Sequence, residues 1–417
     1  MKDIIVQKAK SSLNYVITFV KWCFIAIVVG AAGGFVGTAF HKSVDYVTEV
    51  RHINGWLIFL LPIGGVVIVS LYKLCKTNAG TNRVIESVRT NKKVPILMAP
   101  LIFVSTVITH LLGGSAGREG AALQLGGSIG YQFGKIFKLD EKDMHLIVML
   151  GMSGVFAALF GTPLTATFFA LEVISVGVIY YVALVPCIIS SIVAYNIALA
   201  FGVTPVKFSN IVMPSMDIIM LLKVVGLALL CALISIGFCS AMKFFDKFAE
   251  SKVPNAYIRA FVGGCAIILL TLAVGTQDYN GAGMDVISRA MNGNAVPFAF
   301  LLKIVFTVIT ISAGFKGGEI VPTFFIGSTF GCVMGGLLGL DPGFGAAIGF
   351  VALFCGVVNC PVASIMLALE VFGAHSILVF AIVCGVSYMM SGYYGLYSSQ
   401  KIMYSKLEAT YININTK

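Results

Sequence analysis

Long apolar runs that carry almost no charge are the feature that most constrains this chain. A helix of about 20 apolar residues crosses the hydrocarbon core of a bilayer, and inside lipid only helices and closed barrels satisfy their own backbone groups. Hydrophobic residues make up 58% of the 417 positions and charged residues 11%. The runs include Trp22 to Phe40, Trp56 to Leu71, Pro95 to Leu112, Ile218 to Met242, Phe261 to Val274 and Ile377 to Met390. We therefore expect an all-α integral membrane protein with about ten to twelve crossings.

The charged residues gather in a few short segments: Lys73 to Lys93, Lys135 to Asp143 and Lys243 to Arg259. Since basic connections face the cytoplasm in multi-pass proteins, we expect a protein of the cell membrane with both termini cytoplasmic. The net charge of +10 favours contact with the anionic headgroups of the lipid bilayer. No basic, aromatic-interleaved module in the sequence favours nucleic acid, and we expect no soluble regulatory domain.

The reactive residue types do not form the patterns that enzymes or metal sites use. The ten cysteines have no C-x-x-C spacing and the five histidines are scattered along the chain. We therefore expect no metal, no cofactor and no catalytic residue. A membrane hydrolase is disfavoured because no Ser/His pairing or phosphate loop is present in the sequence.

An internal repeat divides the sequence. At an offset of 200 positions, Gly117–Glu119 aligns with Gly317–Glu319, and at an offset of 198 positions Pro163–Val173 aligns with Pro361–Val371. A weak two-fold repeat in a membrane protein is typical of transporters and channels whose substrate site lies between the halves. We expect two membrane repeats that together form one anion-transport domain: 1–210 and 211–417.

The aligned segments share a glycine-rich break, an acidic residue and a resumed apolar helix. Glycine lets the backbone turn, and the resumed helix exposes unpaired N–H groups and the positive end of its dipole at membrane depth. An anion is the natural ligand there. The alternative is that glycines such as Gly117, Gly126 and Gly317 only allow helices to pack closely. The repeat and the neighbouring acids favour the anion site.

Four acids lie inside apolar sequence, where an unpaired carboxylate is costly. Glu119 and Glu319 follow the breaks, so we predict that they act in gating and proton transfer. Deprotonated Glu119 would occupy the anion site, and protonated Glu119 would swing out and carry a proton. Glu172 and Glu370 end the second pair of aligned segments, and we interpret them as structural acids paired with a polar group.

The segment Gly113–Gly127, which contains Gly117-Arg118-Glu119-Gly120, resembles the G-R-E-G-P signature of the CLC family of chloride channels and halide/proton antiporters. Three further segments follow in the family's order: Gly80–Asn82, Gly317–Pro322 and Leu396–Ser398. The resemblance implies a CLC-type inverted repeat of tilted and broken transmembrane helices. It also implies a homodimer with one anion pathway in each subunit.

The resemblance assigns roles to individual positions. Glu119 is the gating and proton-accepting glutamate, and Tyr397 donates a hydroxyl to the central anion. Thr81 takes the place of the family's anion-facing serine, unless a shift of two positions puts Ala79 there. The predicted anion-binding residues are Thr81, Arg118, Gly120, Ile320, Val321 and Tyr397. Arg118 and Lys316 flank the breaks, and each has the alternative of satisfying carbonyls or a buried acid.

Departures from the family pattern favour one branch. Chloride/proton antiporters usually carry an inner glutamate that relays protons, but Val173 follows Glu172 here. Glu319, at the variable position of the second glycine motif, is similar to the fluoride-transporting branch, and Ala121 replaces the usual proline. We therefore expect fluoride/proton antiport that exports fluoride, with halide and proton as partners. The alternatives are a chloride/proton antiporter and a voltage-gated-type chloride channel. Glu319 has its own alternatives, a second gate or an ion-pair partner of Lys316.

Overall fold

The computed structural model describes residues 2–77, 80–90, 92–208, 211, 214 and 217–417. Ala79 and the predicted repeat boundary at residue 210 lie outside these residues. The helices of the first half are α1 (Lys2–Ile53), α2 (Leu61–Leu74), α3 (Thr81–Thr90), α4 (Met98–Leu111), α5 (Glu119–Ile136), α6 (Glu141–Phe160), α7 (Pro163–Glu172) and α8 (Leu184–Ala200). Those of the second half are α9 (Ile218–Lys252), α10 (Ala256–Val274), α11 (Met284–Met291), α12 (Ala299–Ser312), α13 (Ile320–Leu337), α14 (Pro342–Val358), α15 (Pro361–Phe372) and α16 (Ile377–Met390).

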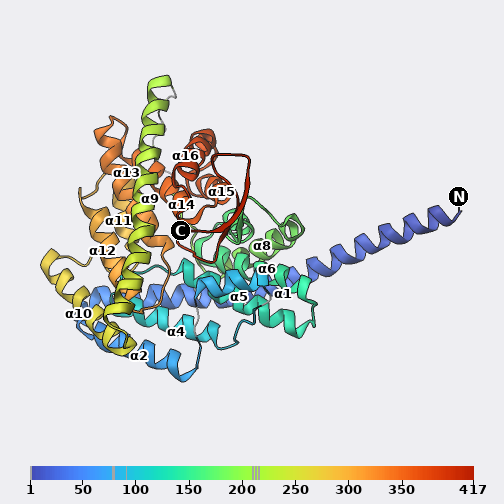
Figure 1. The fold of residues 1–417 in the computed structure, drawn as a ribbon, viewed down its shortest axis with the longest axis horizontal. Coiled ribbons are helices and arrows are strands. Elements are labelled where there is room, and N and C mark those ends of the chain that lie inside the picture. The colour runs from blue at the N-terminus through green and yellow to red at the C-terminus, as the bar shows by residue number, and fades with distance from the viewer. Residues whose placement is uncertain (1, 78–79, 91, 209–210, 212–213, 215–216) are drawn as a thin grey trace.

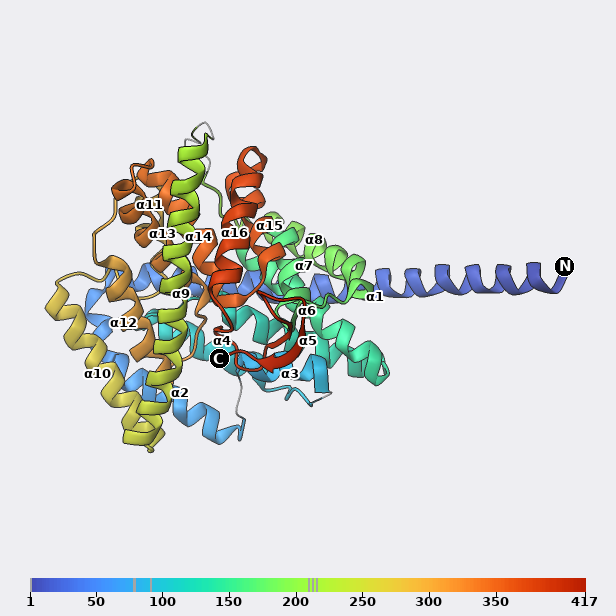
Figure 2. The same ribbon diagram turned by 45° about the horizontal axis from the view of Figure 1, so that its top comes forward.

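Three short 3₁₀ helices and three strands complete the described elements: η1 (Gly55–Leu60), η2 (Tyr181–Ala183), η3 (Ala374–Ser376), β1 (Ser175–Val176), β2 (Lys401–Tyr404) and β3 (Tyr411–Asn415). The N-terminal part of α1 projects well beyond the other helices (Figure 1). The long helix α9 runs beside α14 and α16 and packs on both (Figure 2).

Seven segments of the described chain are long and apolar enough to cross a membrane: α1, η1 with α2, α6, η2 with α8, α9, α10 and α13. Five other apolar helices, α4, α12, α14, α15 and α16, are shorter. The expected ten to twelve crossings therefore depend on the short helices as well. Short helices that end at membrane depth are the broken helices that the resemblance implies.

Glycine allows the closest helix pairs in both halves. A Cβ placed on Gly126 of α5 would lie 2.2 Å from Gly151 O of α6, and one on Gly327 of α13 would lie 2.3 Å from Gly349 O of α14. Any larger residue there would push the helices apart. For Gly126 and Gly327, close packing is therefore a sufficient explanation.

The carboxylates of Glu172 and Glu370 each accept hydrogen bonds from the other half of the chain. Glu172, the last residue of α7, accepts hydrogen bonds from Val362 N (3.2 Å) and Ala363 N (2.8 Å) at the start of α15. Glu370, near the end of α15, accepts from Leu164 N, Thr165 N and Thr165 Oγ1 at the start of α7 (2.7–2.8 Å). Both helices begin with proline, so the next two N–H groups are the ones that need a partner. Each carboxylate thus caps the positive end of the other's helix.

Replacing Glu172 or Glu370 with glutamine should destabilise the protein. One carboxylate oxygen becomes an NH₂ group that faces an N–H donor, which costs about 1–3 kcal/mol for a buried unpaired donor. We expect a lower unfolding temperature in detergent for each variant. Glu49→Gln, an exposed position on α1, is the control and should leave the unfolding temperature unchanged. Equal unfolding temperatures for all three variants would contradict the capping role.

The described chain also contains a three-stranded sheet, which the all-α expectation did not include. β2 pairs in parallel with β1 and antiparallel with β3. Near the end of this sheet, Thr416 Oγ1 donates to the backbone oxygen of Tyr397 at 2.6 Å. The sheet therefore holds the loop that carries Tyr397. β1 and β2 span two and four residues and show no clear alternation. The five residues of β3, Tyr-Ile-Asn-Ile-Asn, do alternate in sequence and in burial, and sequence reasoning missed this signal.

Candidate anion site

The two glycine-rich breaks meet inside the protein. Gly117 N donates to Gly318 O and Gly318 N to Gly117 O, each at 2.6 Å, which makes an isolated antiparallel bridge. A Cβ on Gly120 would lie 2.8 Å from Gly318 Cα, so only glycine permits this approach. The bridge brings together the starts of α5 and α13, whose first N–H groups have no partner within their helices.

Glu119 lies over the start of its own helix. Its side chain is 2% exposed, and its Oε2 accepts a hydrogen bond from Arg118 N at 3.0 Å. A Cβ on Gly117 would lie 3.1 Å from the same oxygen. The carboxylate therefore lies at the start of α5, where the first N–H groups have no partner within the helix.

The guanidinium group of Arg118 contacts two carboxylates. Its Nη1 donates to Asp45 of α1, and its Nε lies 3.6 Å from Glu119 Oε1. His41 Nε2 lies 2.9 Å from the second oxygen of Asp45. The contact with buried Glu119 agrees with the alternative that Arg118 satisfies a buried acid, although its nearer partner, Asp45, is exposed. The role of Arg118 as an anion ligand stays a prediction.

Glu319 immediately precedes α13 and faces the first break. A Cβ on Gly120 would lie 3.1 Å from Glu319 Oε2, and this oxygen has no hydrogen-bond partner among the described residues. Lys316 lies instead over the Tyr72 ring, 5.0 Å from its centroid. Within the described chain no Lys316–Glu319 pair approaches within 4.0 Å, so the ion-pair alternative for Glu319 is not observed.

The remaining predicted ligands differ in how closely they approach the breaks. Ile320 and Val321 are the first two residues of α13 and are buried. Thr81 Oγ1 lies 3.4 Å from Gly120 O and accepts a hydrogen bond from Gln124 Nε2 at 3.1 Å. Tyr397 is 2% exposed, and its hydroxyl has no partner among the described residues. A buried hydroxyl without a partner is costly, and an anion would satisfy it.

Glu119 faces a cavity of about 360 Å³ whose lining includes Asp45, Arg118, Glu119 and Val321. We refer to it as the Glu119 cavity. Its walls come from both halves of the chain, because α1 and α5 belong to the first half and α13 to the second.

Glu319 faces a second cavity, of about 450 Å³, whose lining includes Asn82, Lys243, Lys247, Glu319 and Ser398. We refer to it as the Glu319 cavity. Lys243 and Lys247 belong to a basic segment that the sequence predicts to face the cytoplasm. The two acids thus border different cavities, although the breaks that carry them touch.

Comparison with known proteins identifies the family. The family model described as voltage gated chloride channel matches residues 64–392. A chloride/fluoride channel protein of Pseudomonas syringae pv. tomato is 36% identical over 395 residues, which cover 93% of this chain and 87% of that protein. The chain belongs to the CLC family.

Solved structures agree with this CLC assignment. A CLC-type fluoride/proton antiporter superposes with a TM-score of 0.88 at 32% identity, covering 92% of this chain and 98% of that one. A slow cyanobacterial Cl⁻/H⁺ antiporter superposes with a TM-score of 0.76 at 20% identity, covering 89% and 94%, which supports the fold alone. This CLC chain is therefore a multi-pass membrane protein with the expected all-α fold. The Pseudomonas protein and the CLC-type antiporter, at 36% and 32% identity, are both named for fluoride.

Sequence reasoning missed several residues of this CLC site. Asp45 and His41 were not predicted, although an acid and a histidine four positions apart on an apolar helix share one face. Gln124 was missed because it lies inside the signature segment without a charge. Asp45 lies 73 positions from Arg118, and no local pattern indicates such a contact.

Proposed function

We propose that this protein exchanges fluoride for protons across the cell membrane, with Glu119 as gate and proton carrier. The observation that carries the proposal is the position of the Glu119 carboxylate. It accepts a backbone N–H at the start of α5, beside the Gly117–Gly318 bridge, and it borders the Glu119 cavity. A carboxylate in that position competes with a halide for the same donors.

Protonation would open the site. A neutral Glu119 loses its attraction to the helix start and to Arg118, and it swings into the Glu119 cavity with its proton. The halide then takes the place of the carboxylate and binds the N–H groups of the first turns of α5 and α13, including those of Gly120, Ile320 and Val321. Backbone donors bind a dehydrated halide without a fixed full charge that would trap it.

Fluoride needs compact and strong donors, because it holds its hydration shell more tightly than chloride. The hydroxyl of Tyr397 and a protonated Glu319 are two such donors. Neither the Tyr397 hydroxyl nor Glu319 Oε2 has another partner among the described residues. Glu319 also borders the Glu319 cavity, so it can pass a proton toward the basic, cytoplasmic side. Thr81 and Arg118 complete the proposed set as neighbours of the site.

The same proposal includes the organisation of the protein. We propose that repeats 1–210 and 211–417 form one transport domain, with the site where Gly117 meets Gly318. We also propose a homodimer, as the family resemblance implies, and cytoplasmic termini, because the basic connections of a multi-pass protein face the cytoplasm. The partners are halide, proton and lipid bilayer, and no catalytic role is proposed.

Purified protein in liposomes tests the function. A fluoride gradient is imposed without any other driving force, and internal pH is followed with an entrapped indicator. Antiport predicts that fluoride moving down its gradient drives protons uphill, and a passive channel cannot do this. Chloride-driven proton movement without a fluoride-driven one would favour the chloride/proton antiporter. Halide flux without proton movement would favour the channel.

A further inference from the structure

The Glu119 cavity contains a second group of polar side chains that the transport cycle above does not use. Arg51, at the end of α1, and His110, at the end of α4, both line this cavity. They lie together, because Arg51 Nη1 donates to the backbone oxygen of His110 at 2.9 Å. Both side chains are almost completely buried, with 2% of Arg51 and 0% of His110 exposed.

The charge of Arg51 has no carboxylate at ion-pair distance among the described residues. No ion pair within 4.0 Å involves Arg51 among the described residues, and its Nε has no hydrogen-bond partner. The guanidinium packs against glycine backbone, since a Cβ on Gly281 would lie 2.6 Å from Nη1. A buried cation of this kind is costly unless an anion joins it.

The other charges that line the cavity are mostly compensated. Arg118 is paired with Asp45, and Asp278 is paired with Arg289 at 2.6 Å. Asp285, in the first turn of α11, also lines the cavity and attracts Arg51 from beyond ion-pair distance. Among the described residues that line the cavity, Arg51 is therefore a cation without an acid at ion-pair distance, and it is available to an incoming anion.

His110 offers an acceptor next to this cation. Its Nδ1 lies 2.9 Å from Thr106 O, so in the neutral ring Nδ1 carries the hydrogen and Nε2 has a free lone pair. That Nε2 is buried and has no partner among the described residues. A site with a cationic donor and a neutral acceptor suits an anion that still holds water. The guanidinium contacts the ion, and the imidazole accepts a hydrogen bond from one of its waters.

We propose that Arg51 and His110 form a waiting site for a hydrated halide in the Glu119 cavity, where the anion stays until Glu119 moves away. The inference rests on the proposed transport function and adds a second binding position to it. Fluoride is the ion that gains most, because it gives up its hydration shell in two steps, one at the waiting site and one at the helix starts.

The location of the site is tested with bromide, which gives anomalous X-ray scattering. Crystals soaked in bromide should show an anomalous peak between the Arg51 guanidinium and His110 Nε2. In Arg51→Gln this peak should disappear, while in Lys42→Gln, a substitution at an exposed position of the same helix, it should stay. Absence of the peak in the wild type would overturn the proposal. Because this measurement needs no transport, it remains decisive if fluoride/proton exchange itself is not observed.

The effect on transport is tested in liposomes whose protein orientation is determined by protease accessibility, with fluoride varied on one side at a time. Arg51→Gln should raise the half-saturating fluoride concentration about tenfold on the side of the Glu119 cavity, because a charge-assisted hydrogen bond is lost. The half-saturating concentration on the opposite side should not change. His110→Phe should raise it about threefold on the same side. Arg51→Lys should recover part of the affinity. Asp285→Asn should lower the half-saturating concentration, because it removes the acid that attracts Arg51.

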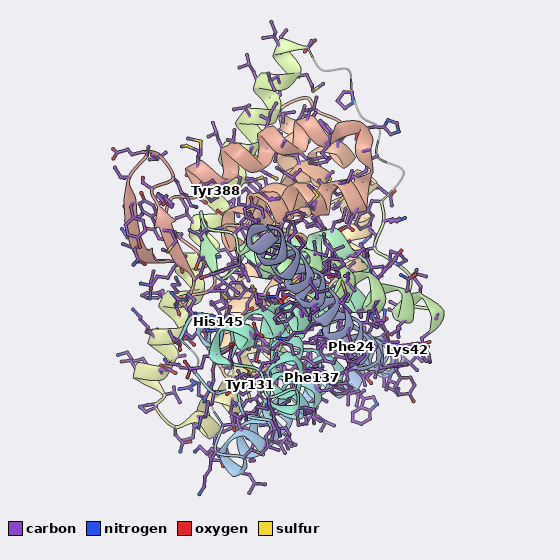
Figure 3. The ribbon with its side chains drawn as sticks, turned by 90° about the vertical axis from the view of Figure 1, so that its right-hand side faces the viewer. Phe24, Lys42, Tyr131, Phe137, His145 and Tyr388 are labelled. Atoms are coloured by element: carbon purple, nitrogen blue, oxygen red, sulfur yellow. The ribbon has the colours of Figure 1, made fainter. Side chains whose placement is uncertain are left out.

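Lys42→Gln is the matched control, with the same loss of charge on the same helix. Lys42 is exposed and is labelled near the edge of the molecule in Figure 3. Its substitution should change neither side. A shift in Arg51→Gln that is equal on both sides, or no larger than in Lys42→Gln, would reduce Arg51 to a structural cap of α4 and overturn the waiting site.

Discussion

Glu119→Gln is expected to abolish proton movement while fluoride still crosses the membrane. Glutamine keeps the size of the side chain but cannot take up and release a proton at membrane depth. It also lacks the charge that holds the carboxylate on Arg118 N and beside the Arg118 guanidinium. The side chain at position 119 should therefore leave the anion site more often than in the wild type, so that fluoride still passes. Fluoride-driven proton flux should fall to the background of protein-free liposomes, because no group at this position carries protons.

Parallel recordings of fluoride with an ion-selective electrode and of protons with a pH electrode measure this effect. The control is Glu49→Gln, an exposed acid on α1, which should keep the wild-type ratio of protons to fluoride. If Glu119→Gln also kept this ratio, Glu119 would not be the proton carrier, and the proposed mechanism would be wrong.

Glu319→Ala is expected to lower fluoride transport and to shift the preference of the protein toward chloride by about tenfold, the factor that corresponds to one strong hydrogen bond. Its Oε2 lies beside Gly120 at the first break and has no partner among the described residues. Alanine would remove this donor and leave more space, which a larger and more weakly hydrated anion tolerates better.

The ratio of initial fluoride to chloride flux at equal gradients measures the preference. Glu319→Gln is the informative companion, because its NH₂ group still donates a hydrogen bond but cannot carry a proton. We expect it to retain more fluoride preference than Glu319→Ala and to lose proton coupling. An unaltered flux ratio in Glu319→Ala would return Glu319 to a structural role.

Much of the fold class could be predicted from the chain alone. An apolar run long enough to cross the bilayer indicates a membrane helix at any position in the chain. The hydrocarbon core requires each such run to satisfy its own backbone hydrogen bonds. Glycine-rich breaks followed by Glu119 and Glu319 are also local patterns, so both acids could be predicted as site residues. The small sheet that holds Tyr397 was not predicted. β1 and β2 are too short to carry a periodic signal, and the alternation of β3 indicates one strand without naming its partners.

The tertiary structure changed the interpretation of several polar residues. The repeat alone indicates that Glu172 and Glu370 occupy equivalent positions, but it does not identify their hydrogen-bond partners. Glu370 accepts a hydrogen bond from Leu164 N, which lies 206 positions away in the sequence. Lys316 was a candidate partner of Glu319, yet it lies over Tyr72. We predicted no role for Arg51 and His110, because an arginine at a helix end and a single histidine usually have structural roles. Only the structure shows that both residues line one cavity and that Arg51 Nε and His110 Nε2 have no hydrogen-bond partner among the described residues.

The sequence by itself determined that this protein is a membrane protein with two acid-bearing helix breaks, since run length, glycine content and the position of acids are properties of short segments. Only the tertiary structure decided that the breaks meet at Gly117 and Gly318 and that Glu119 and Glu319 border separate cavities. It also decided that Arg51 has no carboxylate at ion-pair distance in the described part of the chain. These are contacts between residues far apart in the chain. They depend on how helices pack around glycine and on which buried polar groups find partners, and neither is encoded in a local pattern.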